Sequence, residues 1–114
     1  MYKNFVNKYL EDVKWATKET SKKELWDVSG RLKGRSNQIL KFDVRALKKD
    51  DNERQTKKGS SRTKADKILM KDDALNIWII VDVPTLHQYI VESQNPVITL
   101  EILKQLDWTI ILKI

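Results

Sequence analysis

Two alternating segments on either side of a short turn constrain the fold of this chain more than any other feature. Residues 25–33 and 39–47 place apolar side chains at every second position, with mostly polar side chains between them. This is the pattern of a β-strand that covers a core with one face. Residues 34–37 read Gly-Arg-Ser-Asn, which is typical of a turn. The sequence therefore predicts a β-hairpin.

A helical interpretation competes for the first half of this hairpin. Leu25, Val28 and Leu32 are spaced as on one face of a helix, and residues 21–24 read Ser-Lys-Lys-Glu, which fits a capping box that could start a second helix. The Ser-Gly pair at 29–30 would weaken a helix interior. We therefore prefer the strand.

The pairing of the two strands can be predicted by placing apolar residues opposite each other. A three-residue loop, Gly34-Arg35-Ser36, achieves this because it pairs Val28 with Phe42. A four-residue loop would instead place charged residues opposite apolar ones. The other pairs that the three-residue loop implies are Trp26 with Val44, Gly30 with Leu40 and Asp27 with Asp43.

Asp27 and Asp43 would then face each other across the hairpin. Opposed like charges destabilise a sheet, so we expect a cation beside them, either a metal ion or Arg45 on the same face. Carboxylates are typical ligands of Mg²⁺, and a neighbouring cation can stabilise the charge that develops during phosphodiester hydrolysis. The three residues form a candidate catalytic site, with the two aspartates as metal ligands. Ordinary ion pairs on a solvated strand are the open alternative.

The positive charge of the chain is concentrated in one segment. The net charge is +6, and residues 45–71 contain ten Lys or Arg and four acids, so the rest of the chain is balanced. Such asymmetry is expected of a protein that contacts a phosphate backbone, while a solvated mobile loop is the alternative. The candidate nucleic-acid-binding residues are Lys48, Lys49, Arg54, Lys57, Lys58, Ser60, Arg62 and Lys64.

Apolar periodicity and turn residues predict the remaining elements. They are a helix at 2–16, a basic loop at about 48–64, a short strand at 65–70, a turn at 71–73, a central strand at 77–83, a helix that opens at Thr85, a helix at 96–106 and a last strand at 108–114. This order predicts a single α+β domain over residues 1–114. We expect a mixed β-sheet of four to five strands, with an N-terminal helix and two C-terminal helices.

Several classes of protein are disfavoured by composition. The chain has no cysteine, which excludes disulfides and thiolate metal sites. It has no apolar run near the roughly 20 residues of a membrane-spanning helix and no pattern of a signal peptide at its N-terminus, so we expect an intracellular, cytoplasmic protein. His87 is the only histidine, and a surface role is favoured for it. The four tryptophans lie in apolar patterns, which favours packing in the core.

The order of elements resembles the αβββαβ core of the PD-(D/E)xK nucleases. Trp26-Asp27 is similar to the first part of their motif and Asp43-Val44-Arg45 to the second. The resemblance implies a Mg²⁺- or Mn²⁺-dependent endonuclease, with Glu11 or Asp12 as a further carboxylate. No Pro precedes Asp27, and Arg45 stands where a Lys is usual. An arginine cannot act as a base.

Two other functions remain open. The first is a nucleic-acid-binding module without catalysis, since Gly30-Arg31-Leu32-Lys33-Gly34 followed by Ile39-Leu40-Lys41-Phe42 resembles the first Sm motif of ring-forming RNA-binding proteins. No second Sm motif follows. The second is an adaptor that binds an acidic protein surface through its lysines. Nucleic acid, DNA ahead of RNA, is the expected partner, and a homodimer is compatible with the sequence.

Overall fold

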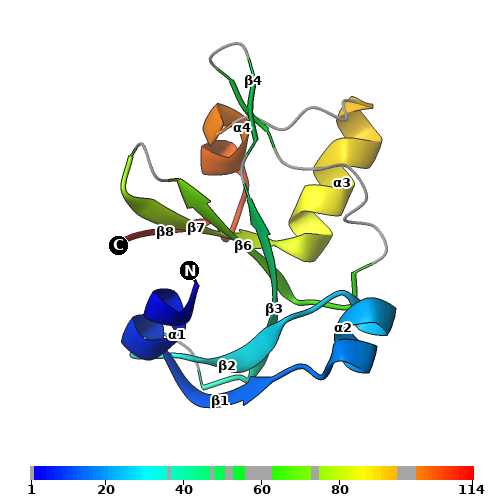
Figure 1. The fold of residues 1–114 in the computed structure, drawn as a ribbon. Helices are drawn as coiled ribbons and strands as arrows, with labels where there is room; N and C mark the ends of the chain where they lie inside the picture. The colour runs from blue at the N-terminus through cyan, green and yellow to red at the C-terminus, as the bar shows by residue number, and fades with distance from the viewer. Residues whose placement is uncertain are drawn as a thin grey trace.

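The computed structural model has an α+β fold built on one mixed β-sheet (Figure 1). It describes residues 2–35, 37–46, 48–50, 53–55, 63–72, 75–94 and 100–114. The elements are α1 (Lys3–Tyr9), β1 (Leu10–Trp15), α2 (Lys18–Glu24), β2 (Val28–Leu32), β3 (Leu40–Ala46), β4 (Lys48–Asp50), β5 (Glu53–Gln55), β6 (Lys67–Asp72), β7 (Ile77–Asp82), α3 (Val83–Ser93), α4 (Leu100–Gln105) and β8 (Ile110–Lys113).

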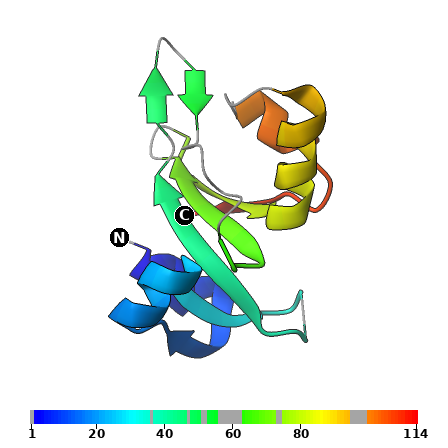
Figure 2. The same cartoon turned by 90° about the vertical axis from the view of Figure 1, so that its right-hand side faces the viewer.

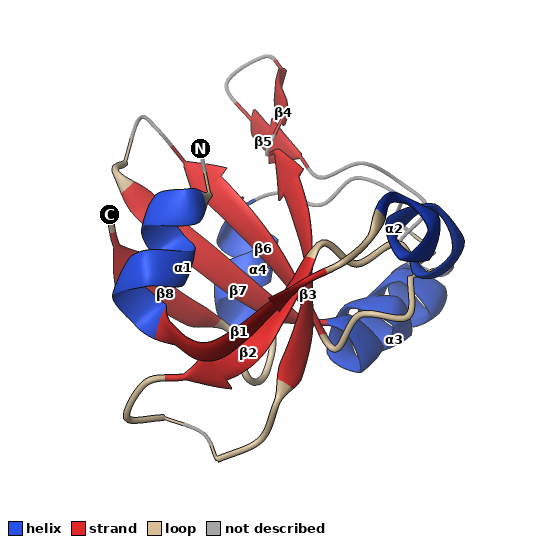
Figure 3. Cartoon of the chain, turned by 60° about the horizontal axis from the view of Figure 1, so that its bottom comes forward, coloured by secondary structure: helices blue, strands red, loops and turns tan. Residues whose placement is uncertain are grey.

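In the described part of the chain, the main sheet has six strands in the order β1-β2-β3-β6-β7-β8. β3 and β6 run parallel, and every other neighbouring pair in this sheet is antiparallel. Figures 1 and 3 show that the sheet is curled, with β1 and β2 turned away from the plane of β6 and β7. The predicted α+β class with a mixed sheet is confirmed, but the sheet has six strands instead of four to five.

Helices cover both faces of the sheet. α1 packs on one face, where Phe5 makes edge-on contacts with Phe42 (5.9 Å between ring centroids) and Trp78 (5.5 Å). α3 and α4 lie on the opposite face (Figure 3), where Leu86 and Leu103 are fully buried. Successive residues of a strand point to opposite faces, and the buried β6 and β7 therefore read as continuous apolar runs.

The predicted hairpin register is confirmed for residues 28–30, but the predicted three-residue loop is wrong, because residues 33–39 connect β2 to β3. Val28 pairs with Phe42 and Gly30 with Leu40 in the β2–β3 ladder. Gly34 has a φ of +68°, a conformation that glycine adopts without steric cost. Ser36, the last residue of the predicted loop, lies outside the described residues.

The predicted helix at 2–16 is wrong beyond residue 9. Residues 10–15 form β1, which pairs with β2 and adds the extra strand to the sheet. A bulge interrupts this pairing between Glu11 and Lys14. Gly30 lies under it, and a Cβ at Gly30 would come within 3.0 Å of the backbone oxygen of Glu11. The pairing satisfies backbone groups of β2 that would otherwise lie at a sheet edge, and helical spacing in the sequence could not reveal it.

A second helix is present, but it lies before the segment for which the competing interpretation predicts one. Thr17 is the N-cap of α2, and its hydroxyl accepts a hydrogen bond from the backbone N–H of Thr20 (3.1 Å). α2 ends at Leu25, which has a left-handed φ of 63°. The capping box at 21–24 therefore starts no helix, because the cap of Thr17 comes first.

The second half of the chain follows the prediction with shifted boundaries. The predicted strands at 65–70, 77–83 and 108–114 correspond to β6, β7 and β8. Lys71 and Asp72 belong to β6 instead of a turn, because they pair with Trp78 and Ile77. The predicted helix at 96–106 is described as α4, while residues 95–99 lie outside the described part of the chain.

The predicted basic loop contains a two-stranded ribbon. β4 and β5 pair antiparallel, so the prediction of a loop is wrong for residues 48–50 and 53–55. A ladder of backbone hydrogen bonds needs no apolar side chain, which is why composition alone does not reveal it. Residues 51–52 and 56–62 of the predicted loop lie outside the described residues. Figure 2 shows the ribbon beyond the end of β3, away from β1 and β2.

Candidate functional site

The carboxylate of Asp27 is bonded to the backbone of the neighbouring strand. Asp27 lies just before β2, and its backbone N–H donates to the carbonyl oxygen of Phe42 (2.8 Å). Its Oδ2 accepts the backbone N–H of Val44 at 2.8 Å, and Ser21 Oγ lies 3.4 Å from its Oδ1. The β2–β3 ladder ends at the Val28–Phe42 pair. The predicted cross-strand pair of Asp27 with Asp43 is therefore not part of the ladder.

The charge of Asp27 also affects the pKa of a nearby tyrosine, Tyr2. Burial raises the pKa of the Tyr2 hydroxyl, and the negative charge of Asp27 raises that pKa further. The ring of Tyr2 packs against Trp15 of β1, with 5.8 Å between the centroids. Asp27 thus belongs to a local cluster that ties α1 and β1 to the start of β2.

Asp43 and Arg45 form a nearly buried ion pair on β3. Asp43 Oδ2 accepts hydrogen bonds from Arg45 Nε (3.2 Å) and Nη2 (2.8 Å), and the two side chains are 9% and 14% exposed. Asp43 is paired in register with Ile68, and Arg45 with Met70, so both lie on the face that α3 and α4 cover. The expected cation beside Asp43 is therefore Arg45, from the same strand.

Glu11 lies too far along the sheet to join Asp27 in one site. It is on β1, in register with Arg31 and 3.8 Å from its guanidinium, and Asp12 also pairs with Arg31. Arg31 is four residues beyond Asp27, which corresponds to about 13 Å along a strand. Across the described ranges, no three His, Cys, Asp or Glu side chains come together in a way that could hold a metal ion.

The predicted phosphate-contacting residues are only partly described. Lys57, Lys58, Ser60 and Arg62 lie outside the described residues. In the ribbon, Lys48 is in register with Gln55 and Lys49 with Arg54. Lys64 belongs to the described residues and is exposed to solvent.

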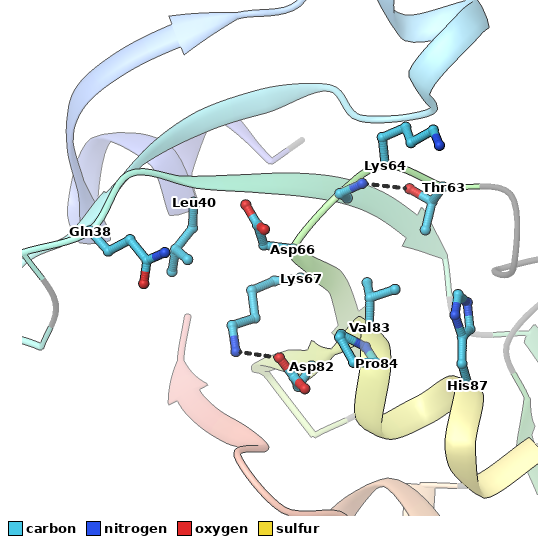
Figure 4. Close-up of a pocket in the computed structure, with 11 residues that line it drawn as sticks. Gln38, Leu40, Thr63, Lys64, Asp66, Lys67, Asp82, Val83, Pro84 and His87 are labelled. Carbon is cyan, nitrogen blue, oxygen red and sulfur yellow. Dashed lines mark hydrogen bonds and ion pairs between the residues drawn. The ribbon is translucent and has the colours of Figure 1, made fainter.

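A cleft of about 460 Å³ lies between the segment 63–67 and the start of α3, and sequence analysis did not find it. Figure 4 shows Lys67 and Asp82 between Leu40 on one side and Val83 on the other. Lys67 Nζ lies 2.8 Å from Asp82 Oδ1, and the two residues are cross-strand neighbours on β6 and β7. His87 reaches the cleft from the second turn of α3 (Figure 4).

Asp82 lines the cleft and also caps the N-terminus of α3. Its Oδ2 accepts the backbone N–H (3.2 Å) and the hydroxyl (2.7 Å) of Thr85, so Asp82 is the N-cap of α3. The predicted opening of this helix at Thr85 is therefore three residues late. Burial by itself raises the pKa of the Asp82 carboxyl, but the hydrogen bonds from Lys67 and Thr85 and the charge of Lys67 outweigh it and hold that pKa below its usual value. The sequence Asp82-Val83-Pro84-Thr85 indicates this start of α3, because aspartate is a preferred N-cap residue and proline is favoured in the first turn of a helix.

Comparisons with protein-family models, with curated proteins and with solved structures find no match for this chain. The resemblance to the PD-(D/E)xK nucleases therefore stays a prediction. None of the helices in the described ranges has the length and apolar character that crossing a membrane requires.

Proposed function

We propose that this protein binds nucleic acid through its basic segment, defined as residues 45–71, with the β4–β5 ribbon as the leading contact. The observation that carries the proposal is the location of the charge, because this segment holds the whole net charge of +6. Part of the segment folds into a ribbon beyond the end of β3 (Figure 2). Clustered lysines and arginines on a projecting element favour contact with a phosphate backbone.

The ribbon has a shape that suits duplex DNA. A two-stranded antiparallel ribbon fits the major groove of B-form DNA, whereas the major groove of an RNA helix is too narrow to be read by side chains. Lys49 and Arg54 are directly opposite each other. Two cationic residues at one position of the ladder suit contact with a phosphate backbone.

The geometry gives binding more support than hydrolysis. Arg45 donates a hydrogen bond to Oδ2 of Asp43, and the backbone N–H of Val44 donates one to Oδ2 of Asp27. Glu11 lies about 13 Å from Asp27 along the sheet. These residues do not fit the Mg²⁺ or Mn²⁺ site that the nuclease resemblance implies, and we derive no metal-dependent step from them. Metal-dependent cleavage stays a prediction, which incubation of labelled DNA with the wild type and with Asp43→Asn tests directly.

Charge reversal in the ribbon tests the proposed function. The double variant Lys49→Glu with Arg54→Glu should bind a fluorescein-labelled duplex at least about tenfold more weakly than the wild type in fluorescence anisotropy, because it loses two phosphate contacts. A double variant with the same change in net charge, Lys3→Glu with Lys113→Glu, is the control. Both of its lysines are exposed, on α1 and β8.

The control should retain most of the affinity. Equal weakening in both double variants would reduce the effect to net charge and overturn the assignment of the ribbon. If neither duplex DNA nor RNA bound the wild type while an acidic protein surface did, the adaptor function would replace the proposal.

A further inference from the structure

The two edge strands of the main sheet differ in how well they are protected from pairing with a further strand. An edge strand presents backbone N–H and C=O groups that another chain can bind, unless bulges or charged side chains prevent it. In β1, a bulge lies between Glu11 and Lys14, and Asp12 within it has a φ of 55°. Three of the six residues of β1 are charged. This edge is therefore protected.

The opposite edge strand, β8, has no such protection in the described part of the chain. Its four residues are Ile-Ile-Leu-Lys, and its register with β7 is regular. No described strand pairs with its outer side. Figure 3 shows β8 at the margin of the sheet, with the C-terminus at its end. β8 is therefore the edge that is open to a further strand.

One hydrogen bond shows which backbone groups of β8 face outward. Ile114 donates its backbone N–H to the carbonyl oxygen of Asn76, just before β7, at 3.2 Å. Alternate residues of an antiparallel ladder face the same neighbouring strand, so Ile111 and Lys113 direct their backbone groups away from β7. The carbonyl oxygen of Lys113 accepts a hydrogen bond from the hydroxyl of Tyr9. The N–H and C=O of Ile111 are thus the groups that this edge offers to a partner strand.

Apolar surface accompanies the open edge. Ile111 is 42% exposed, and Trp108, two residues before β8, is 76% exposed. Trp108 is the most exposed of the large apolar residues in the described ranges. A strand bound along β8 would remove part of this surface from water, which favours pairing.

Charges of opposite sign lie at the two ends of β8. Asp107 precedes the strand and Lys113 ends it, and both are exposed. In an antiparallel pair of two β8 strands, the start of each strand lies beside the end of the other. The register that pairs Ile111 with Thr109 of a second copy also places Lys113 opposite Asp107 of that copy. This charge complementarity favours a second copy of the chain as the partner.

We propose that this protein forms a homodimer in which the two β8 strands pair antiparallel about a twofold axis. The pairing joins two six-stranded sheets into one continuous sheet. Ile111 exchanges backbone hydrogen bonds with Thr109 of the second copy, and Lys113 meets Asp107 of the second copy. Because the contact is symmetric, each of these interactions occurs twice. The dimer goes beyond the proposed function and does not depend on it.

Sedimentation velocity in buffer without nucleic acid tests the dimer. The wild type should change from monomer to dimer between about 1 and 100 μM, as a small interface allows. Ile111→Lys should raise the dissociation constant at least about tenfold, because it places a charge at the paired edge of each copy. Val13→Lys is the matched control and should leave the constant unchanged, since Val13 is 37% exposed and lies on β1, at the other edge.

Asp107→Lys tests the charge pairing. It replaces two attractions across the twofold axis with two repulsions, so the dissociation constant should rise about fivefold. Glu19→Lys, with the same change in net charge at an exposed position of α2, should leave it unchanged. Because Asp107 is exposed, this variant keeps the test decisive even if Ile111→Lys fails to fold.

Three results would overturn the proposal. The first is a wild type that stays monomeric over the whole concentration range, which would leave the β8 edge to a strand of another protein. The second is a dimer that neither Ile111→Lys nor Asp107→Lys weakens. The third is a dimer that Val13→Lys weakens instead. Each result is obtained without nucleic acid, so it leaves the proposed function untouched.

Discussion

At the scale of single residues, Asp43 and Arg45 show how a pattern typical of an active site can be structural. Both residues lie on the α3 and α4 face of the sheet and are more than four-fifths shielded from solvent. A buried carboxylate loses its hydration, and the guanidinium replaces it with charged hydrogen bonds. We therefore assign this pair to the stability of β3.

Breaking the Asp43–Arg45 pair should cost more than removing it. Arg45→Met leaves the Asp43 carboxylate buried without its cation, and the free energy of unfolding should fall by about 3–5 kcal/mol. The double variant Asp43→Leu with Arg45→Met should recover most of that loss. Urea denaturation measures both values. Equal losses in the single and double variants would contradict a role for the pair in stability.

Asp82 should make stability depend on pH in the acid range. Its carboxyl has a folded-state pKa below the usual value of 3.8, so its contribution is present above that value and is lost as pH falls through the folded-state pKa. Asp82→Asn keeps a good N-cap residue but loses the charge pair with Lys67. Unfolding of Asp82→Asn followed at pH 7 and pH 2 should show a smaller stability difference between the two pH values than the wild type shows. An unchanged difference would contradict the coupling of Asp82 to Lys67.

At the scale of elements, the strands that can be predicted are those whose burial is visible as a pattern of apolar residues in the sequence. The β2–β3 register follows from apolar alternation, and β7 follows from its continuous apolar run. β1 could not be predicted in this way, because only Leu10 of its six residues is buried. Its strand conformation comes from pairing with β2, a contact between distant positions that local periodicity does not encode.

The candidate site was predictable to a smaller extent. The sequence predicts either a metal ion or Arg45 beside Asp43, since residues two apart on a strand share a face, and the structure shows Arg45 there. The cleft could not be predicted, since it depends on the parallel pairing of β3 with β6 and on the antiparallel pairing of β6 with β7. Those two pairings bring Leu40, Lys67 and Asp82 together from separate parts of the sequence.

A methyl group at Gly30 should disturb β1. The added Cβ would lie 3.0 Å from the backbone oxygen of Glu11 and 3.4 Å from the Cβ of Leu10. Gly30→Ala should lower the free energy of unfolding by about 1–3 kcal/mol, as overpacking typically does. Gly34→Asn is the comparison: no atom lies within 4 Å of a Cβ at Gly34, so a loss of stability there reports the strain of its positive φ and not a steric clash. A Gly30→Ala protein as stable as the wild type would show that the bulge in β1 can move.

At the scale of the whole molecule, the positive charge is concentrated in the same segment that forms the β4–β5 ribbon. The basic segment supplies the entire net charge, its ribbon extends beyond β3 (Figure 2), and its C-terminal part lines the cleft beside α3 (Figure 4). The rest of the fold, with α1 on one face and α3 and α4 on the other, holds these parts in position. The account therefore predicts that the basic segment is the surface that contacts nucleic acid.

The salt dependence of duplex DNA binding tests this central claim most directly. Each phosphate that the protein neutralises contributes about 0.9 to the negative slope of log affinity against log salt concentration. The wild type should give a steep slope, and Lys49→Glu with Arg54→Glu should reduce its magnitude by about 2. An affinity that does not change with salt concentration, or a slope that is the same in this variant and in the wild type, would contradict the account.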